Sequence, residues 1–106
     1  MSLSITPDAL ERLGQLQQER KFTEEEYYPG APTEQIRSEC EHRVNVFLSD
    51  VVRSLRSGTD RHDIFTRARR LIEAFGEDDT EEREKVGDYI AEAMRIIGLT
   101  DWTGYV

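Results

Sequence analysis

The stretch over residues 34–57 carries apolar side chains at the spacing of one long α-helix. On a helix that turns about 100° per residue, these side chains fall within an arc of about 160°. An arc this wide exceeds the stripe that one neighbouring helix covers, so we expect this helix to pack against two or more others. The apolar positions are Ile36, Cys40, Val44, Phe47, Leu48, Val51, Val52 and Leu55.

Three further helices are predicted around it, over about residues 7–20, 60–75 and 80–97. The first has Thr6 as its N-cap and Pro7 at its first helical position, both of which favour a helix start. The last begins in an acid-rich segment, which suits the positive end of a helix dipole. No stretch of the chain alternates apolar and polar residues as a strand does, so no strand is predicted.

Two boundaries are predicted from their local chemistry. The helix over 60–75 should be capped by Thr59 or Asp60, whose side chains can accept a hydrogen bond from the first turn. Gly98 followed by Leu99 matches a Schellman ending, in which a glycine adopts a positive φ. These residues therefore predict where the helix over 60–75 begins and where the last helix ends.

Connections of about two and four residues join the later helices, and such short connections make neighbours antiparallel. A chain of 106 residues is also the size of one domain. The predicted fold is all-α, a single helical domain over residues 1–106. It is a small antiparallel four-helix bundle, with a proline-turned connection at Pro29 between helices 1 and 2. Gly87, inside the last helix, is expected to mark a close approach between two helices.

The charge of the chain excludes several classes of partner. Its formal net charge is −8, which disfavours nucleic acid and anionic membranes, since both are bound through Lys and Arg. Residues 77–92 hold eight acids against two bases, so a basic protein is the partner that charge would recognise. The arginines over residues 50–75 are expected to form pairs along the helix, Arg67 with Asp63 and Arg69 with Glu73.

The sequence predicts neither a membrane span nor a signal peptide. No apolar run reaches the roughly 18 residues that a membrane span requires. The first residues, "MSLSITPDALERL", lack the basic and then apolar layout of a signal peptide. We therefore expect a cytoplasmic protein with no membrane partner.

No catalytic residue, metal site or cofactor is predicted. Glu39 and His42 have the Glu-x-x-His spacing of di-metal bundles, but those sites need two such pairs facing inward, and these two residues should face solvent. His62 and Asp63 are adjacent on a helix and point about 100° apart, so they do not form an acid–base couple. Cys40 lies between two glutamates, which disfavour a thiolate, and is expected to be a packed, inert cysteine.

The segment "EEEYYPG", residues 24–30, offers the best recognition candidates. Pro29 keeps Tyr28 extended, and Pro29-Gly30 suits the centre of a type II turn. Tyr27 and Tyr28 lie outside the helices, where aromatic side chains either cover the open end of a bundle or serve as anchors for a partner. Both interpretations stay open, and packing is slightly favoured.

Two resemblances bear on this segment. "YYP" at 27–29, in a small acidic helical protein, is similar to the Tyr-Tyr-Pro element of the nuclease-colicin immunity proteins. In that family the two tyrosines and nearby acids bind a basic nuclease toxin. Here the element lies between the first two helices and its acids precede it. "KFTEEEYYPGAP" and the closing "IIGLTDW" also resemble a family of small bacterial helical domains of unknown function, which implies the fold and a bacterial cytosolic origin.

We therefore predict a non-enzymatic, acidic protein-binding module of a bacterial cytosol, immunity- or antitoxin-like toward a basic protein. The alternative is an assembly subunit that self-associates through the helix over 34–57 or through the C-terminal tail, so the protein is a monomer or a homodimer. Val46 lies outside the apolar arc, and an exposed Val46 beside Val52 or Trp102 would favour the alternative. The predicted partner-binding residues are Glu24, Glu25, Glu26, Tyr27, Tyr28, Asp78, Asp79, Glu81 and Glu82.

Overall fold

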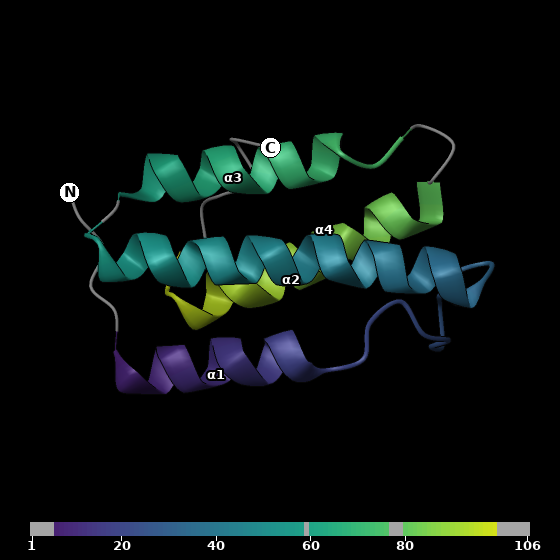
Figure 1. Cartoon of the computed structure of the whole chain (residues 1–106), viewed down its shortest axis with the longest axis horizontal. Helices are drawn as coiled ribbons and strands as arrows, with labels where there is room; N and C mark the ends of the chain where they lie inside the picture. Colours follow the sequence, from purple (N-terminus) through teal and green to yellow (C-terminus); the bar gives the residue numbers. More distant parts are fainter. Residues whose placement is uncertain (1–5, 59, 77–79, 100–106) are drawn as a thin grey trace.

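The computed structural model describes residues 6–58, 60–76 and 80–99, and these contain four α-helices and no strand. The all-α prediction is confirmed. Successive helices run in opposite directions, with α1 and α3 on opposite sides of α2 and α4 behind it (Figure 1). The helices are α1 (Pro7–Gln18), α2 (Glu34–Arg56), α3 (Arg61–Glu73) and α4 (Thr80–Ile96).

The starts of α1, α2 and α3 are each capped by a side chain. Thr6 Oγ1 accepts a hydrogen bond from the Ala9 amide at 3.1 Å, and Thr33 Oγ1 accepts one from Ile36 at 3.1 Å. Asp60 caps α3 in the same way. These oxygens satisfy amides that have no partner within the helix, which explains why the sequence pattern located the starts correctly.

The predicted ending of α4 is also confirmed. Gly98 has a φ of +81°, and the Leu99 amide donates to the Met94 carbonyl at 2.8 Å, as in a Schellman motif. The prediction for Gly87 is wrong. A Cβ atom added at Gly87 would meet nothing within 4 Å, so no neighbouring helix comes close to it.

The long helix α2 contacts α1, α3 and α4, as the width of its apolar arc predicted. Val44 and Val51 are fully buried in the core that these helices share, and Cys40 is buried there too. The arginines of α3 pair as expected, with Arg67 Nε 3.1 Å from Asp63 Oδ2 and Arg69 Nε 3.2 Å from Glu73 Oε1.

Phe22, in the connection after α1, contributes a ring to the core that helical periodicity did not predict. Its ring stacks on Phe75 at 6.1 Å and meets the Tyr89 ring edge-on at 5.2 Å. Its φ is +61°, a conformation that side chains other than glycine rarely adopt. The Phe22 amide donates to the Tyr89 hydroxyl at 2.9 Å, so packing and hydrogen bonding together hold the strained residue.

Lys21, the residue before it, is fully buried. Its Nζ donates to the carbonyls of Gln17 and Glu19 at 3.2 and 2.9 Å, and so satisfies acceptors at the end of α1. Burial lowers the pKa of Lys21, while the carboxylates of Glu41 and Glu19 act against that shift. The buried ammonium therefore takes the place of water at the end of this helix.

The same connection is bound to the start of α2 by a charged cluster. The Lys21 amide donates to Glu41 Oε2 at 2.7 Å, and Arg37 donates to the same carboxylate at 2.7 Å and to the Lys21 carbonyl at 3.1 Å. Arg37 also bonds Glu34, which pairs with Arg20 at 2.9 Å. These contacts fix the direction in which the chain leaves α1.

Candidate protein-binding surface

Residues 25–28 form a tight reverse turn, three residues earlier than predicted. The Glu25 amide donates to the Tyr28 carbonyl at 2.7 Å, and the Tyr28 amide donates to the Glu25 carbonyl at 3.2 Å. Glu26 and Tyr27 therefore occupy the tip. The prediction that Pro29-Gly30 forms the centre of the turn is wrong, because the carbonyl of Tyr28 is bonded backward to Glu25.

Gly30 instead closes the base of this loop. Its φ is +87°, and a Cβ atom at this position would lie 3.1 Å from the Glu24 backbone nitrogen. The next amide, Ala31, donates to the Phe22 carbonyl at 3.1 Å. A glycine is required here both for the left-handed conformation and for the close approach of two backbone segments.

The two tyrosines point in opposite directions. Tyr28 is 7% exposed and Tyr27 is 93% exposed. The Tyr28 hydroxyl donates to Glu82 Oε2 of α4 at 2.9 Å, and both groups are buried. Burial and this hydrogen bond to a carboxylate raise the pKa of Tyr28. Tyr28 and Glu82 were both predicted to bind a partner, and the structure corrects this, since they belong to the interior.

Lys85 of α4 holds the loop from its other side. Its Nζ lies 2.5 Å from Glu25 Oε2, and 5.9 and 5.4 Å from the ring centroids of Tyr28 and Tyr89. Burial acts to lower the pKa of Lys85, but the hydrogen bond to Glu25 and the charges around it raise the pKa overall. The positive charge is therefore retained at the base of the loop, and Glu25 is partly neutralised.

The exposed Tyr27 lies beside a hollow of about 350 Å³ between the loop and α4. Its other lining residues include Glu81, Glu84 and Asp88, and among the described residues neither Glu81 nor Glu84 has an ion pair. Glu24 and Glu26 of the loop are exposed as well. We call this set the Tyr27 surface, and it consists of Glu24, Glu26, Tyr27, Glu81, Glu84 and Asp88.

The structure thus joins two of the predicted acidic segments, residues 24–26 and the first turn of α4. Asp78 and Asp79 lie outside the described residues. Glu84 and Asp88 were not predicted, although their spacing from Glu81 places all three carboxylates along one side of α4. Helical spacing was the signal that could have found them.

Carboxylates around an exposed aromatic ring are suited to binding a cationic side chain. A guanidinium or ammonium group can lie over the face of Tyr27 while it pairs with Glu81 or Glu84. The part of the chain that the structure describes contains no group of three His, Cys, Asp or Glu side chains able to hold a metal ion. No helix in that part is long and apolar enough to cross a bilayer.

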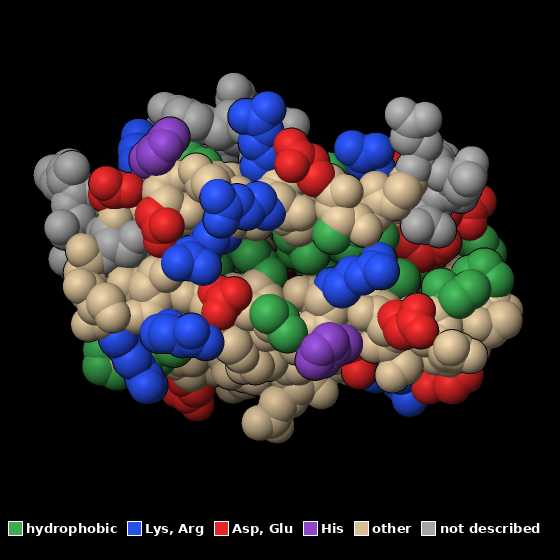
Figure 2. Space-filling view, turned by 45° about the horizontal axis from the view of Figure 1, so that its top comes forward, with side chains coloured by type: hydrophobic (Ala, Val, Ile, Leu, Met, Phe, Trp, Pro, Cys, Tyr) green, Lys and Arg blue, Asp and Glu red, His purple; other side chains and the backbone are tan. Residues whose placement is uncertain are grey.

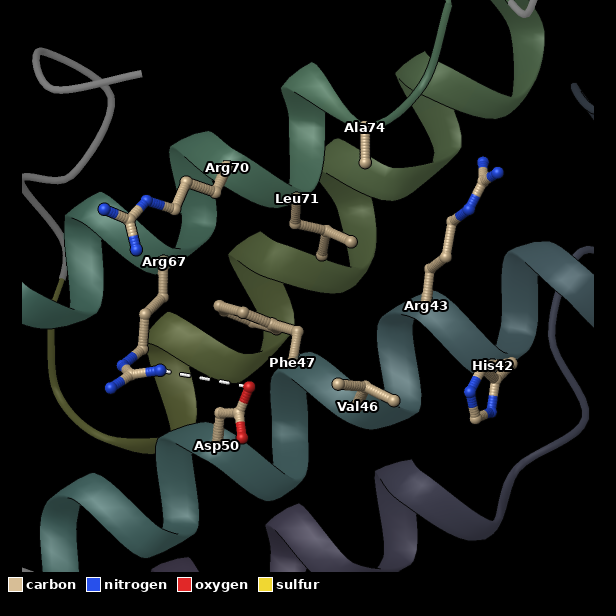
Figure 3. Close-up of a pocket in the computed structure, with 9 residues that line it drawn as sticks. All are labelled: His42, Arg43, Val46, Phe47, Asp50, Arg67, Arg70, Leu71 and Ala74. Carbon is tan, nitrogen blue, oxygen red and sulfur yellow. Dashed lines mark ion pairs between the residues drawn. The ribbon is translucent and has the colours of Figure 1, made fainter.

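Among the residues that the structure describes, no side-chain hydrogen bond or ion pair joins either histidine to a carboxylate. His42 and His62 are both exposed. His42 lies at the edge of a groove that also contains Asp50, but its ring turns away from that residue (Figure 3). Asp50 forms ion pairs with two arginines, Arg53 at 3.1 Å and Arg67 at 3.9 Å.

Comparison with known proteins gives a family and no closer relative. No curated protein and no solved structure matches the chain. One family model, described as Domain of unknown function (DUF4844), matches residues 4–105, nearly the whole length. The chain therefore belongs to the DUF4844 family.

Proposed function

We propose that the protein is a non-enzymatic binding module of a bacterial cytosol, and that its Tyr27 surface takes a basic protein. The observation that carries the proposal is the side chain of Tyr27, which is 93% exposed at the tip of a turn and is surrounded by carboxylates. An exposed aromatic ring contributes little to folding, whereas a ring that a partner covers is among the strongest anchors at interfaces.

The loop is well prepared for binding. Its backbone is closed by the bonds between Glu25 and Tyr28, and its base is fixed to α4 through Glu82 and Lys85. A loop that is already ordered loses little conformational entropy when a partner binds. The net charge of −8 and the free carboxylates would attract a basic partner from a distance and speed association.

The resemblance to nuclease-colicin immunity proteins supports the type of partner, an immunity- or antitoxin-like recognition of a basic protein. Of the two tyrosines in the Tyr-Tyr-Pro element, only Tyr27 is available to a partner in this chain, because Tyr28 is buried. The proposed surface therefore gains its remaining contacts from Glu81, Glu84 and Asp88 of α4.

Capture of partners from bacterial lysate tests the proposal. The wild-type chain, the Tyr27→Ala variant and the Glu81→Gln/Glu84→Gln variant are immobilised in parallel. We expect a basic protein on the wild type, with an affinity that falls with salt and drops about 30-fold or more for Tyr27→Ala. The charge-neutral variant should slow association more than it speeds dissociation.

The matched control is Gln15→Ala, which truncates an exposed side chain of α1 outside the Tyr27 surface and outside the groove that contains Asp50. It should capture the same protein with unchanged affinity. Equal capture by the wild type, Tyr27→Ala and Glu81→Gln/Glu84→Gln would overturn the proposal, because none of the residues that define the surface would then contribute.

A further inference from the structure

A second surface, on another face of the molecule, has the complementary chemistry. A groove of about 340 Å³ lies between α2 and α3, and it is open along the surface in the space-filling view (Figure 2). Val46 and Phe47 contribute from α2, and Leu71 and Ala74 from α3 (Figure 3). Val46 is 44% exposed, so the groove presents apolar surface to solvent.

Arginines stand at the edges of this apolar groove. Arg43 of α2 and Arg70 of α3 lie on its two sides (Figure 3), and neither has an ion pair among the described residues. The Arg43 guanidinium lies 5.1 Å from the centroid of the Phe75 ring. In a chain with a net charge of −8, unpaired guanidinium groups beside an apolar hollow favour an acidic segment that carries an apolar side chain.

The chain itself contains such a segment. At the tip of its loop, Tyr27 projects into solvent between Glu26 and the buried Tyr28, and Glu24 is exposed nearby. We propose that the loop of one copy of this chain docks in the α2–α3 groove of a second copy. Tyr27 would fill the hollow beside Val46 and Leu71, and the glutamates of the loop would pair with Arg43 and Arg70.

The positions of the two surfaces determine the kind of assembly. The loop lies at the end of the bundle where α2 begins, whereas the groove lies along the side formed by α2 and α3 (Figure 1, Figure 2). The contact therefore joins two different surfaces. Such a contact closes into a dimer when a two-fold axis relates the copies, closes into a larger ring when another rotation closes, and otherwise continues as an open chain. Because the loop is small, the association should be weak and concentration-dependent.

The inference rests on the proposed function for the chemistry of the loop, since both use Tyr27 as the anchor. It adds that the two contacts exclude each other. A copy whose loop lies in a groove cannot present Tyr27 to a basic partner, so the partner must compete with self-association. The loop would therefore bind either the basic partner or the α2–α3 groove of a second copy.

Sedimentation velocity over about a hundredfold range of protein concentration tests the inference. We expect the wild-type mass to rise with concentration and to fall back with added salt. Tyr27→Ala, which removes the anchor, and Arg43→Glu/Arg70→Glu, which reverses the charge of the groove, should each stay monomeric. The charge-matched control, Arg56→Glu/Arg69→Glu, alters exposed arginines outside the groove and should associate like the wild type.

Mixing the two monomeric variants gives the decisive result. The Tyr27→Ala chain keeps its groove, and the Arg43→Glu/Arg70→Glu chain keeps its loop, so the mixture should form a complex of one copy of each. Circular dichroism confirms that both variants are folded. A wild type that is monomeric throughout, association that survives either variant, or a mixture that stays monomeric would each overturn the inference.

Failure of the proposed function can be told apart from failure of the self-association inference. The groove variant should still capture the basic partner, whereas Glu81→Gln/Glu84→Gln should bind the partner more slowly and keep self-association, because these residues lie outside the loop. A wild type that self-associates but captures no basic protein would count against the basic partner alone. A wild type that captures a basic protein but stays monomeric would count against the groove alone.

Discussion

The hydrogen bond between Tyr28 and Glu82 joins two polar side chains that are both buried. The Tyr28 hydroxyl lies 2.9 Å from Glu82 Oε2. A buried carboxylate that loses its donor keeps the cost of desolvation without the compensating bond. The adjacent Tyr27 has no such role, since its side chain is almost fully exposed.

We therefore expect Tyr28→Phe to lower the free energy of unfolding by about 1–3 kcal/mol. The matched change Tyr27→Phe should alter it by no more than about 0.5 kcal/mol. Urea unfolding followed by circular dichroism measures both. If the two variants have equal stability, the hydrogen bond to Glu82 contributes nothing and Tyr28 is held by packing alone.

Nothing local distinguishes these two tyrosines in the sequence. They are identical and adjacent. Their environments differ because Glu82 and Lys85, which are distant in the sequence, contact Tyr28 from α4. The turn at Glu26 and Tyr27 was missed for a similar reason. Pro29 and Gly30 are the stronger turn signals, but the backbone bonds between Glu25 and Tyr28 place the turn three residues earlier.

At the scale of elements, the helices follow local chemistry closely. Thr6, Thr33 and Asp60 act as N-caps, and Gly98 ends α4, each as its residue type indicates. The connection between α1 and α2 does not follow local chemistry. Lys21 and Phe22 are buried there by contacts with other elements, and an irregular segment has no periodicity that could reveal them.

Gly87, inside α4, lowers the stability of this helix without a packing reason. Gly87 has open space where a Cβ atom would lie, and glycine is less favourable than alanine in a helix. We expect Gly87→Ala to raise the free energy of unfolding by about 0.8–1.0 kcal/mol, measured by thermal and urea unfolding.

Gly98→Ala is the control, because Gly98 also has open space but has a φ of +81°. That substitution should be destabilising, since an alanine in the left-handed conformation is strained. A destabilising Gly87→Ala would mean that α4 meets a neighbour at that position after all.

At the scale of the whole molecule, pH acts through the charged cluster that joins α1 to α2. Hydrogen bonds and charge from Arg37 and Arg20 lower the pKa of Glu34. For Glu41, partial burial acts to raise the pKa, but bonds from the Lys21 amide and from Arg37 lower it overall. Carboxyl groups with a lowered pKa in the folded state stabilise it above their unfolded pKa, and that contribution is lost as the pH falls through the folded pKa.

The stability of the protein should therefore fall as the pH drops below about 4.5, the ordinary glutamate pKa. Arg37→Leu removes the guanidinium that both carboxylates share. We expect it to have a lower Tm than the wild type near neutral pH, and we expect the difference to shrink as the cluster is protonated. Thermal unfolding from neutral to strongly acidic pH measures this. A difference in Tm that is constant across the series would contradict the assignment.

The loop that bears Tyr27 depends on residues far along the chain. Tyr28 bonds Glu82, which is 54 positions later, and Glu25 and Phe22 bond Lys85 and Tyr89, which are 60 and 67 positions later. At the usual pace of protein synthesis, these partners emerge about 3 to 13 s after the loop does. We therefore expect an unfinished chain to lack an ordered Tyr27 surface until α4 has been synthesised.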